Sequence, residues 1–180
     1  DRNSFLDGND ASTNPADSPA ALAMEKQISK FKPLLDIILQ LPPLSALGLL
    51  RYCQLHVRVV HLLRAHTAEV TARATSTLNQ LTTEAQEKLL NSTNLPTRVT
   101  NRMRLPGRYG GDSLFNSALV ADPAFLASSL SFLVSELDAG RGFSPSTGLA
   151  KEIDAALARV RPKLPLEHSN TLPRNTADIP

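Results

Sequence analysis

Residues 67–90 read TAEVTARATSTLNQLTTEAQEKLL and give the strongest helix signal in the chain. Their apolar side chains recur at steps of three and four residues, which is the spacing of one face of an α-helix. Thr67 is a residue type that caps helix N-termini, because its hydroxyl can accept a hydrogen bond from a free backbone N–H. The stretch therefore predicts a long amphipathic helix with one buried stripe, made by Val70, Ala74, Leu78, Leu81, Ala85 and Leu89.

Two further helices are predicted on the N-terminal side of this one. The first covers residues 18–41, where Ser18 supplies a capping side chain and a proline follows it at the first helical position. Pro33 lacks a backbone donor, so we expect a kink or break between residues 29 and 32. The second covers about residues 44–65 and is apolar over much of its surface, which is typical of a central helix.

The C-terminal side begins with residues 91–113, which lack helical periodicity and contain two prolines, three glycines and four arginines. This composition predicts a structured loop with room for one short strand. A fourth helix is predicted from Asp122, a capping residue followed by proline, to Gly140, and a fifth over residues 144–160. The expected fold is all-α, with a single domain of about five helices around one core at residues 20–161.

Both ends of the chain differ from this middle part. Residues 1–19 contain four aspartates, two prolines and only two bulky apolar side chains, which predicts a disordered polar tail or linker. Residues 162–180 contain four prolines among polar residues, which predicts a disordered proline-rich tail. Because the chain opens on Asp1 and not on methionine, we expect it to be a processed product or a fragment.

Composition excludes several classes of function. With 19 Lys and Arg against 17 Asp and Glu, the net charge is only +2, so any basic site has to be local. Aromatic residues make up 4% and Trp is absent, which argues against a base-stacking platform. No apolar run approaches the roughly 20 residues of a membrane-spanning helix, so no membrane partner is expected. One cysteine excludes a disulfide framework within the chain.

The residues that could carry catalysis or bind a metal form no recognisable pattern. Cys53, His56, His61 and His66 are zinc-binding types, but only side chains three or four residues apart share a helix face, so the four do not converge. The chain has no G-x-S-x-G motif, no complete phosphate loop and no adjacent aspartates. We therefore expect no catalytic residue, metal or cofactor in this chain, and whether it belongs to an enzyme stays open.

Two groups of arginines are the most informative feature. Residues 51–66 contain three arginines and three histidines without an acid, and residues 98–108 contain four arginines without an acid. Guanidinium groups bind phosphate oxygens through paired hydrogen bonds, so two such groups would follow a nucleic-acid backbone if they met in the fold. The alternative is that these arginines balance the acidic segments or cap the ends of helices.

Two segments carry a family resemblance. Residues 42–66, PPLSALGLLRYCQLHVRVVHLLRAH, resemble the helix after the catalytic palm in reverse-transcriptase-like proteins of non-long-terminal-repeat retrotransposons. Residues 104–130, RLPGRYGGDSLFNSALVADPAFLASSL, are similar to a later segment of the same proteins, and residues 24–42 fit the linker helix before them. The resemblance covers about residues 24–137. The family's catalytic tyrosine-x-aspartate-aspartate motif, its fingers and most of its palm are absent from this chain.

The resemblance implies the thumb and connection region of a longer RNA-directed DNA polymerase. Such a region would hold RNA or an RNA–DNA hybrid by its phosphates, beside the missing upstream polymerase domains and without reading the base sequence. The alternative is a helical protein-interaction or scaffold module that binds no nucleic acid. Candidate phosphate contacts are Arg51, Arg58, Arg64, Arg104 and Arg108. A tight structural turn is expected at Gly107, Gly110 and Gly111, where the lack of Cβ atoms permits close packing.

Overall fold

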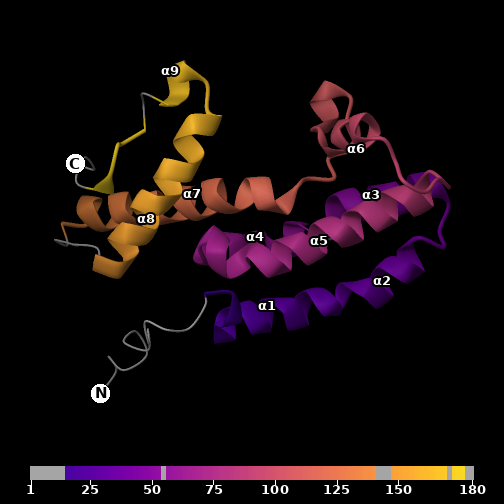
Figure 1. The fold of residues 1–180 in the computed structure, drawn as a ribbon, viewed down its shortest axis with the longest axis horizontal. Coiled ribbons are helices and arrows are strands. Elements are labelled where there is room, and N and C mark those ends of the chain that lie inside the picture. The colour runs from indigo at the N-terminus through magenta and orange to yellow at the C-terminus, as the bar shows by residue number, and fades with distance from the viewer. Residues whose placement is uncertain (1–14, 54–55, 141–146, 170–171, 177–180) are drawn as a thin grey trace.

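The computed structural model describes residues 15–53, 56–140, 147–169 and 172–176, and its regular elements over these residues are all helical (Figure 1). The all-α prediction is therefore confirmed, but the helices are more numerous than the five expected. The α-helices are α1 (Pro19–Ser29), α2 (Phe31–Ile38), α3 (Pro43–Cys53), α4 (His56–Ala65), α5 (Ala68–Leu89), α6 (Thr97–Arg104), α7 (Ser117–Asp138), α8 (Thr147–Val160) and α9 (Leu166–Ser169). Short 3-10 turns are η1 (Pro15–Asp17), η2 (Gly107–Tyr109) and η3 (Arg161–Lys163).

Four differences account for the larger number of helices, and one of them is α9, which lies in the predicted C-terminal tail. The first predicted helix is divided into α1 and α2, within the interval where a break was expected, and the second corresponds to α3 and α4. The predicted loop after α5 contains α6, whose inner face buries Thr100 and Met103. A pair of buried residues three apart is too short a pattern to stand out from the surrounding arginines.

The start of α1 and the break after it follow from local sequence. Ser18 Oγ accepts a hydrogen bond from the backbone N–H of Ala21 at 3.2 Å, and Pro19 occupies the first helical position. The break falls at Lys30, so Pro33 lies in the first turn of α2. The first turn of a helix needs no intrahelical N–H bond, and the missing donor of proline costs little there.

The first hydrophobic core surrounds α5, which packs against α1, α4 and α7. Of the predicted stripe, four residues are buried, whereas Val70 and Leu89 are partly buried and pack against the same core. Thr67 occupies the N-cap position of α5 but makes no side-chain capping hydrogen bond. The buried side chains of this core are Met24, Ile28, Phe31, Leu35, Ile38, Ala46, Leu50, Val59, Ala74, Leu78, Leu81, Ala85, Met103 and Leu114.

A second core lies between α7 and α8, whereas the sequence predicts only one core. The helix α7 packs against α4 and α5 and also against α8, so it joins the helices of the first core to the second core, to which its own buried side chains belong. Figure 1 shows α8 crossing α7 beyond the end of the α4–α5 region. The buried side chains of the second core are Phe125, Leu126, Leu133, Ile153, Ala156, Leu157 and Val160.

The prediction that the fourth helix starts at Asp122 is wrong, because α7 begins five residues earlier. Asn116 caps it, and Asn79 of α5 donates a hydrogen bond to the Asn116 side chain at 2.8 Å. The Asn79 side-chain oxygen also accepts the backbone N–H of Ser117 at 2.9 Å. A residue of α5 therefore helps to start α7, and Pro123 is left inside the helix.

Parts of both predicted tails are folded. Residues 1–14 lie outside the described residues, but η1 packs against α1 and α5. After α8, Leu164 and Leu172 pack against the second core, and the Arg161 guanidinium donates to the backbone carbonyl oxygens of Ser169 and Leu172. The described residues of the segment 162–176 are thus held against α8, because two partly buried leucines pack on the second core and Arg161 binds the chain that follows it.

Glu152 on α8 supplies a pH-dependent prediction. Partial burial, and then the negative charge of Glu69 on α5, raise the pKa of Glu152. A raised folded-state pKa means that this group favours the fold below its unfolded pKa of about 4.3 and loses that contribution as the pH rises. We therefore expect Glu152→Gln to raise the urea midpoint of unfolding at pH 7 and to have a shrinking effect as the pH falls towards about 4. An equal effect at both pH values would contradict this.

Candidate functional site

The segment between α6 and α7 forms a closed turn, which we call the glycine turn (residues 105–113). The backbone N–H of Asp112 donates to the Met103 carbonyl oxygen at 3.0 Å, and that of Ser113 donates to the Leu105 carbonyl oxygen at 2.9 Å. The Ser113 hydroxyl accepts the N–H of Gly107 at 3.0 Å. These bonds fold the turn back onto the end of α6.

Each of the three glycines meets a different spatial demand. A Cβ at Gly107 would lie 2.6 Å from Nη2 of Arg51, and a Cβ at Gly111 would lie 2.2 Å from the Leu105 carbonyl oxygen. Gly110 has open space around it but a φ of 75°, in the left-handed region that other residues rarely adopt. The three glycines thus supply two close approaches and one left-handed backbone conformation, and Ser113 adds a second such conformation with a φ of 57°.

Arg51 joins α3 to the glycine turn. Its Nη2 donates to the Gly111 carbonyl oxygen at 2.9 Å, across sixty positions of sequence. Arg104 is used in a similar way, since its Nη2 donates to Thr83 Oγ1 on α5 at 3.3 Å. Both arginines are half-buried. Two of the five predicted phosphate contacts therefore hold the turn and α6 against the rest of the fold.

The other three predicted contacts lie in different places. Arg108 is exposed on η2, with its guanidinium carbon 4.9 Å from the Tyr109 ring centroid, a cation–π distance. Arg64 is exposed in the last turn of α4, beside the N-terminus of α5. Thr83, which accepts the hydrogen bond from Arg104 of α6, lies on α5 roughly 24 Å from the N-terminus of that helix, at a rise of about 1.5 Å per residue. Arg58 lies in α4, and its side chain is outside the described residues. Arg64 and the glycine turn thus form no single groove.

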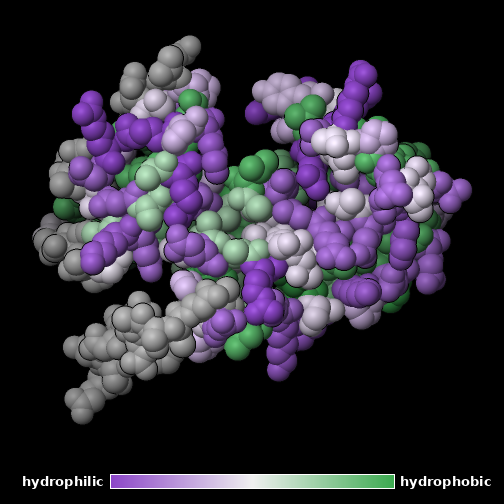
Figure 2. Space-filling view, viewed as in Figure 1, coloured by the Kyte–Doolittle hydropathy of each residue, from purple (hydrophilic) through white to green (hydrophobic). Residues whose placement is uncertain are grey.

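Three exposed arginines lie on α6 and η2. Arg98 and Arg102 are exposed and four residues apart, so they share one face of α6, and Arg108 follows on η2. Figure 2 shows hydrophilic side chains over the end of the molecule that carries α6. We call Arg98, Arg102 and Arg108 the arginine face. Within the described ranges, none of them takes part in an ion pair with a carboxylate. Arg98 and Arg102 belong to the predicted cluster at 98–108, but spacing alone did not single them out.

An open pocket of about 510 Å³ lies between α6 and the glycine turn. Its polar side chains are two guanidinium groups of the arginine face and the carboxylate of Asp112. Its apolar wall comes from the end of α5 and the inner side of α6. The lining residues are Leu90, Arg98, Val99, Arg102, Met103, Gly110 and Asp112.

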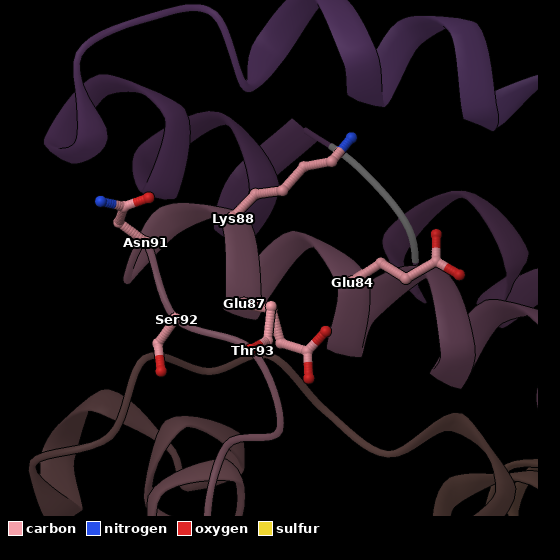
Figure 3. A pocket seen from close by; sticks show the side chains of 6 residues that line it. All are labelled: Glu84, Glu87, Lys88, Asn91, Ser92 and Thr93. Carbon is pink, nitrogen blue, oxygen red and sulfur yellow. The ribbon is translucent and has the colours of Figure 1, made fainter.

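A second hollow, of about 460 Å³, lies at the C-terminal end of α5 and is drawn in Figure 3. Glu84 and Glu87 line it, and both carboxylates accept hydrogen bonds from the chain, at 3.0 Å from the Gln80 amide and 2.9 Å from the Asn94 N–H. The Lys88 side chain points away from them and pairs with Asp36 at 3.1 Å. The two carboxylates, of which Glu84 is exposed and Glu87 half-buried, make this hollow unsuitable for a phosphate.

The predicted zinc-type residues give no further site. No group of three or more His, Cys, Asp or Glu side chains could hold a metal ion in the part of the chain that the structure describes. His61 is exposed, and burial lowers the pKa of the half-buried His66. The side chains of Cys53 and His56 lie outside the described residues.

The length and composition of α7 bear on the expected lack of a membrane partner. Of the described helices, α7 is the one long and apolar enough to cross a membrane. Of its most apolar stretch of 18 residues, 33% is buried in the fold. Core helices of soluble proteins meet the same test, and Asp122 of α7 is ion-paired with Arg159 of α8 at 2.9 Å. The lack of a membrane partner stays a prediction.

The chemistry of this surface follows from its donors. Three exposed guanidinium groups on neighbouring turns present planar pairs of N–H donors, which match phosphate oxygens. Arg51 and Arg104 hold in place the backbone that carries the arginine face.

No family model, curated protein or solved structure matches this chain.

Proposed function

We propose that this chain is a non-catalytic, nucleic-acid-binding region of a reverse-transcriptase-like protein of the retrotransposon type. It holds RNA or an RNA–DNA hybrid through backbone phosphates. The observation that carries the proposal is the arginine face, where three exposed guanidinium groups have no carboxylate partner among the described residues. Such groups remain available to phosphate oxygens, whereas arginines in ion pairs do not.

The two segments that carry the family resemblance support the same proposal. Residues 42–66 include α3, and residues 104–130 include the glycine turn. The contact between Arg51 and Gly111 brings these two segments together. Arg51 and Arg104 position the arginine face from behind it, while Arg58 and Arg64 on α4 remain candidate contacts for a more distant part of the nucleic acid.

Salt dependence tests this proposal. We expect the affinity for an RNA–DNA hybrid to fall steeply between 50 and 200 mM salt, since each phosphate contact releases about 0.7–0.9 counterions. The double substitution Arg98→Gln, Arg102→Gln should lower the slope of log affinity against log salt by about two. The measurement is filter binding of labelled hybrid.

The matched control is Arg73→Gln. Arg73 on α5 is exposed, but its side chain is ion-paired with Asp17 at 3.4 Å and Glu25 at 2.9 Å. This variant should bind hybrid as the unmodified chain does. An affinity that is indifferent to salt would rule out phosphate binding.

A helical protein-interaction module is the second candidate. It is favoured by exposed apolar side chains around the turn from α2 to α3, where Ile37 is 62% and Leu44 is 85% exposed. Figure 2 also shows a hollow with a hydrophobic floor between the α6 end and the α8–α9 end. Exposed apolar patches of this kind mark contacts with other proteins. Protection from proteolysis by a protein partner, with no salt-dependent nucleic-acid binding, would favour this candidate.

A further inference from the structure

Asp112 is a carboxylate placed beside a surface that otherwise collects positive charge. It is half-buried and lines the pocket between α6 and the glycine turn, together with Arg98 and Arg102. Within the described residues its carboxylate takes part in no hydrogen bond or ion pair, so it is not neutralised by either arginine. A surface that bound only phosphates would gain nothing from this group, because like charges repel.

The fold does not use the Asp112 side chain. Its backbone N–H makes the hydrogen bond to Met103 that closes the turn, and any residue except proline could supply that donor. The N-terminus of α7 is capped by the Asn116 side-chain amide and does not use the Asp112 carboxylate. The side chain of Asp112 is therefore free to contact a ligand in the pocket.

The rest of the pocket suits a flat, partly apolar group. Its wall is formed by Leu90, Val99 and Met103, of which Met103 is only 7% exposed. A volume of about 510 Å³ falls within the range of about 300–1,000 Å³ of small-ligand sites. Aliphatic and thioether side chains pack against the faces of aromatic rings, and the two arginines stand at the rim to bind flanking phosphates.

We propose that this pocket binds one unpaired nucleobase of the bound strand and that Asp112 selects guanine. This inference rests on the proposed function, because Arg98 and Arg102 would hold the phosphates on either side. An ionised carboxylate only accepts hydrogen bonds, and guanine presents two adjacent donors, N1–H and the N2 amino group, to its two oxygens. On the Watson–Crick edge, adenine, cytosine and uracil each place an acceptor next to a single donor. This acceptor would face the carboxylate of Asp112 and be repelled by it.

The test uses the whole chain and nine-nucleotide oligouridines that carry guanosine, inosine, adenosine or uridine at the central position. Fluorescence anisotropy at 50 mM salt measures the affinity for each. We expect the guanosine oligomer to bind about tenfold more tightly than the all-uridine one, within the range of bidentate base contacts. Inosine lacks the N2 amino group, so its oligomer should lie between the two.

Two variants separate base selection from phosphate binding. Asp112→Asn replaces one acceptor oxygen by a donor, so we expect it to remove the preference for guanosine and leave binding of the all-uridine oligomer unchanged or slightly tighter. The double substitution Arg98→Gln, Arg102→Gln should weaken all four oligomers by a similar factor. An unchanged thermal midpoint for Asp112→Asn would show that this variant is folded.

The outcomes distinguish the two proposals. If binding depends on salt but guanosine is not preferred, or if Asp112→Asn keeps the preference, the base pocket is refuted while phosphate binding stands. If Asp112→Asn weakens the all-uridine oligomer as much as the guanosine one, the side chain has a structural role and the pocket is again refuted. If no oligomer binds in a salt-dependent way, the proposed function itself is refuted.

Discussion

Gly111→Ala is expected to lower the free energy of unfolding by about 3 kcal/mol, the upper end of the usual cost of overpacking. An added Cβ would lie 2.2 Å from the Leu105 carbonyl oxygen and 2.6 Å from that of Arg102. Both are backbone atoms, so no change of rotamer relieves the clash and the turn itself has to open. Urea unfolding followed by circular dichroism measures the loss.

The matched control for this variant is Gly48→Ala. Gly48 lies within α3, and an added Cβ there would meet nothing within 4 Å. Alanine is the better helix former, so this substitution should raise the stability by about 0.5–1 kcal/mol. If Gly111→Ala unfolds at the same urea concentration as the unmodified chain, the close packing of Gly111 against the Leu105 and Arg102 carbonyl oxygens is contradicted. The Gly111 carbonyl oxygen accepts the hydrogen bond from Arg51. Because opening the turn in Gly111→Ala would break this bond, the variant should also bind nucleic acid more weakly at the arginine face.

Asp122→Ala is expected to cost about 3 kcal/mol, near the lower end of values for breaking a buried ion pair. Asp122 is 5% exposed in α7, and its two carboxylate oxygens accept hydrogen bonds from Nε of Arg159 at 3.1 Å. These hydrogen bonds raise the pKa of Arg159, so the pair stays charged. Arg159 is 32% exposed and also pairs with Glu69 at 2.8 Å, which limits the cost of leaving it without Asp122.

Further variants check the origin of this effect. Glu69→Gln removes the outer partner, whose side chain is 59% exposed, and should cost less than about 1 kcal/mol, as surface pairs do. Arg159→Met combined with Asp122→Ala should cost less than the sum of the single changes, because the two residues act as a pair. A loss below 1 kcal/mol for Asp122→Ala would mean that the pair does not hold α7 to α8. Thermal or urea unfolding of the unmodified chain, Asp122→Ala, Arg159→Met and the double variant completes the cycle.

The parts of the fold that sequence predicted are those with local causes. The α5 stripe depends on spacing within one helix, and the cap at Ser18 with the break at Lys30 depends on neighbours a few residues away. The start of α7 could not be predicted in this way, because Asn79 on another helix holds its first residues. Asp122 looks like a cap in the sequence, but in the fold it is the partner of Arg159.

The candidate site shows the same division. Its arginine-rich composition was visible in the sequence, and so were the glycines of its turn. Spacing could not tell which arginines face solvent, since Arg51 and Arg104 find their partners sixty and twenty-one positions away. The pocket beside Asp112 was also hidden, because its wall includes Leu90 from the end of α5.

The contact between Arg51 and the glycine turn also constrains how this chain can diverge during evolution. A side chain at position 107 would displace the guanidinium, and a shorter residue at position 51 would leave the Gly111 carbonyl without this donor. Changes at one of these positions are therefore tolerated mainly together with changes at the other. Among descendants of a common ancestor, α3 and the turn should be inherited as a matched pair, even where the rest of the surface has drifted.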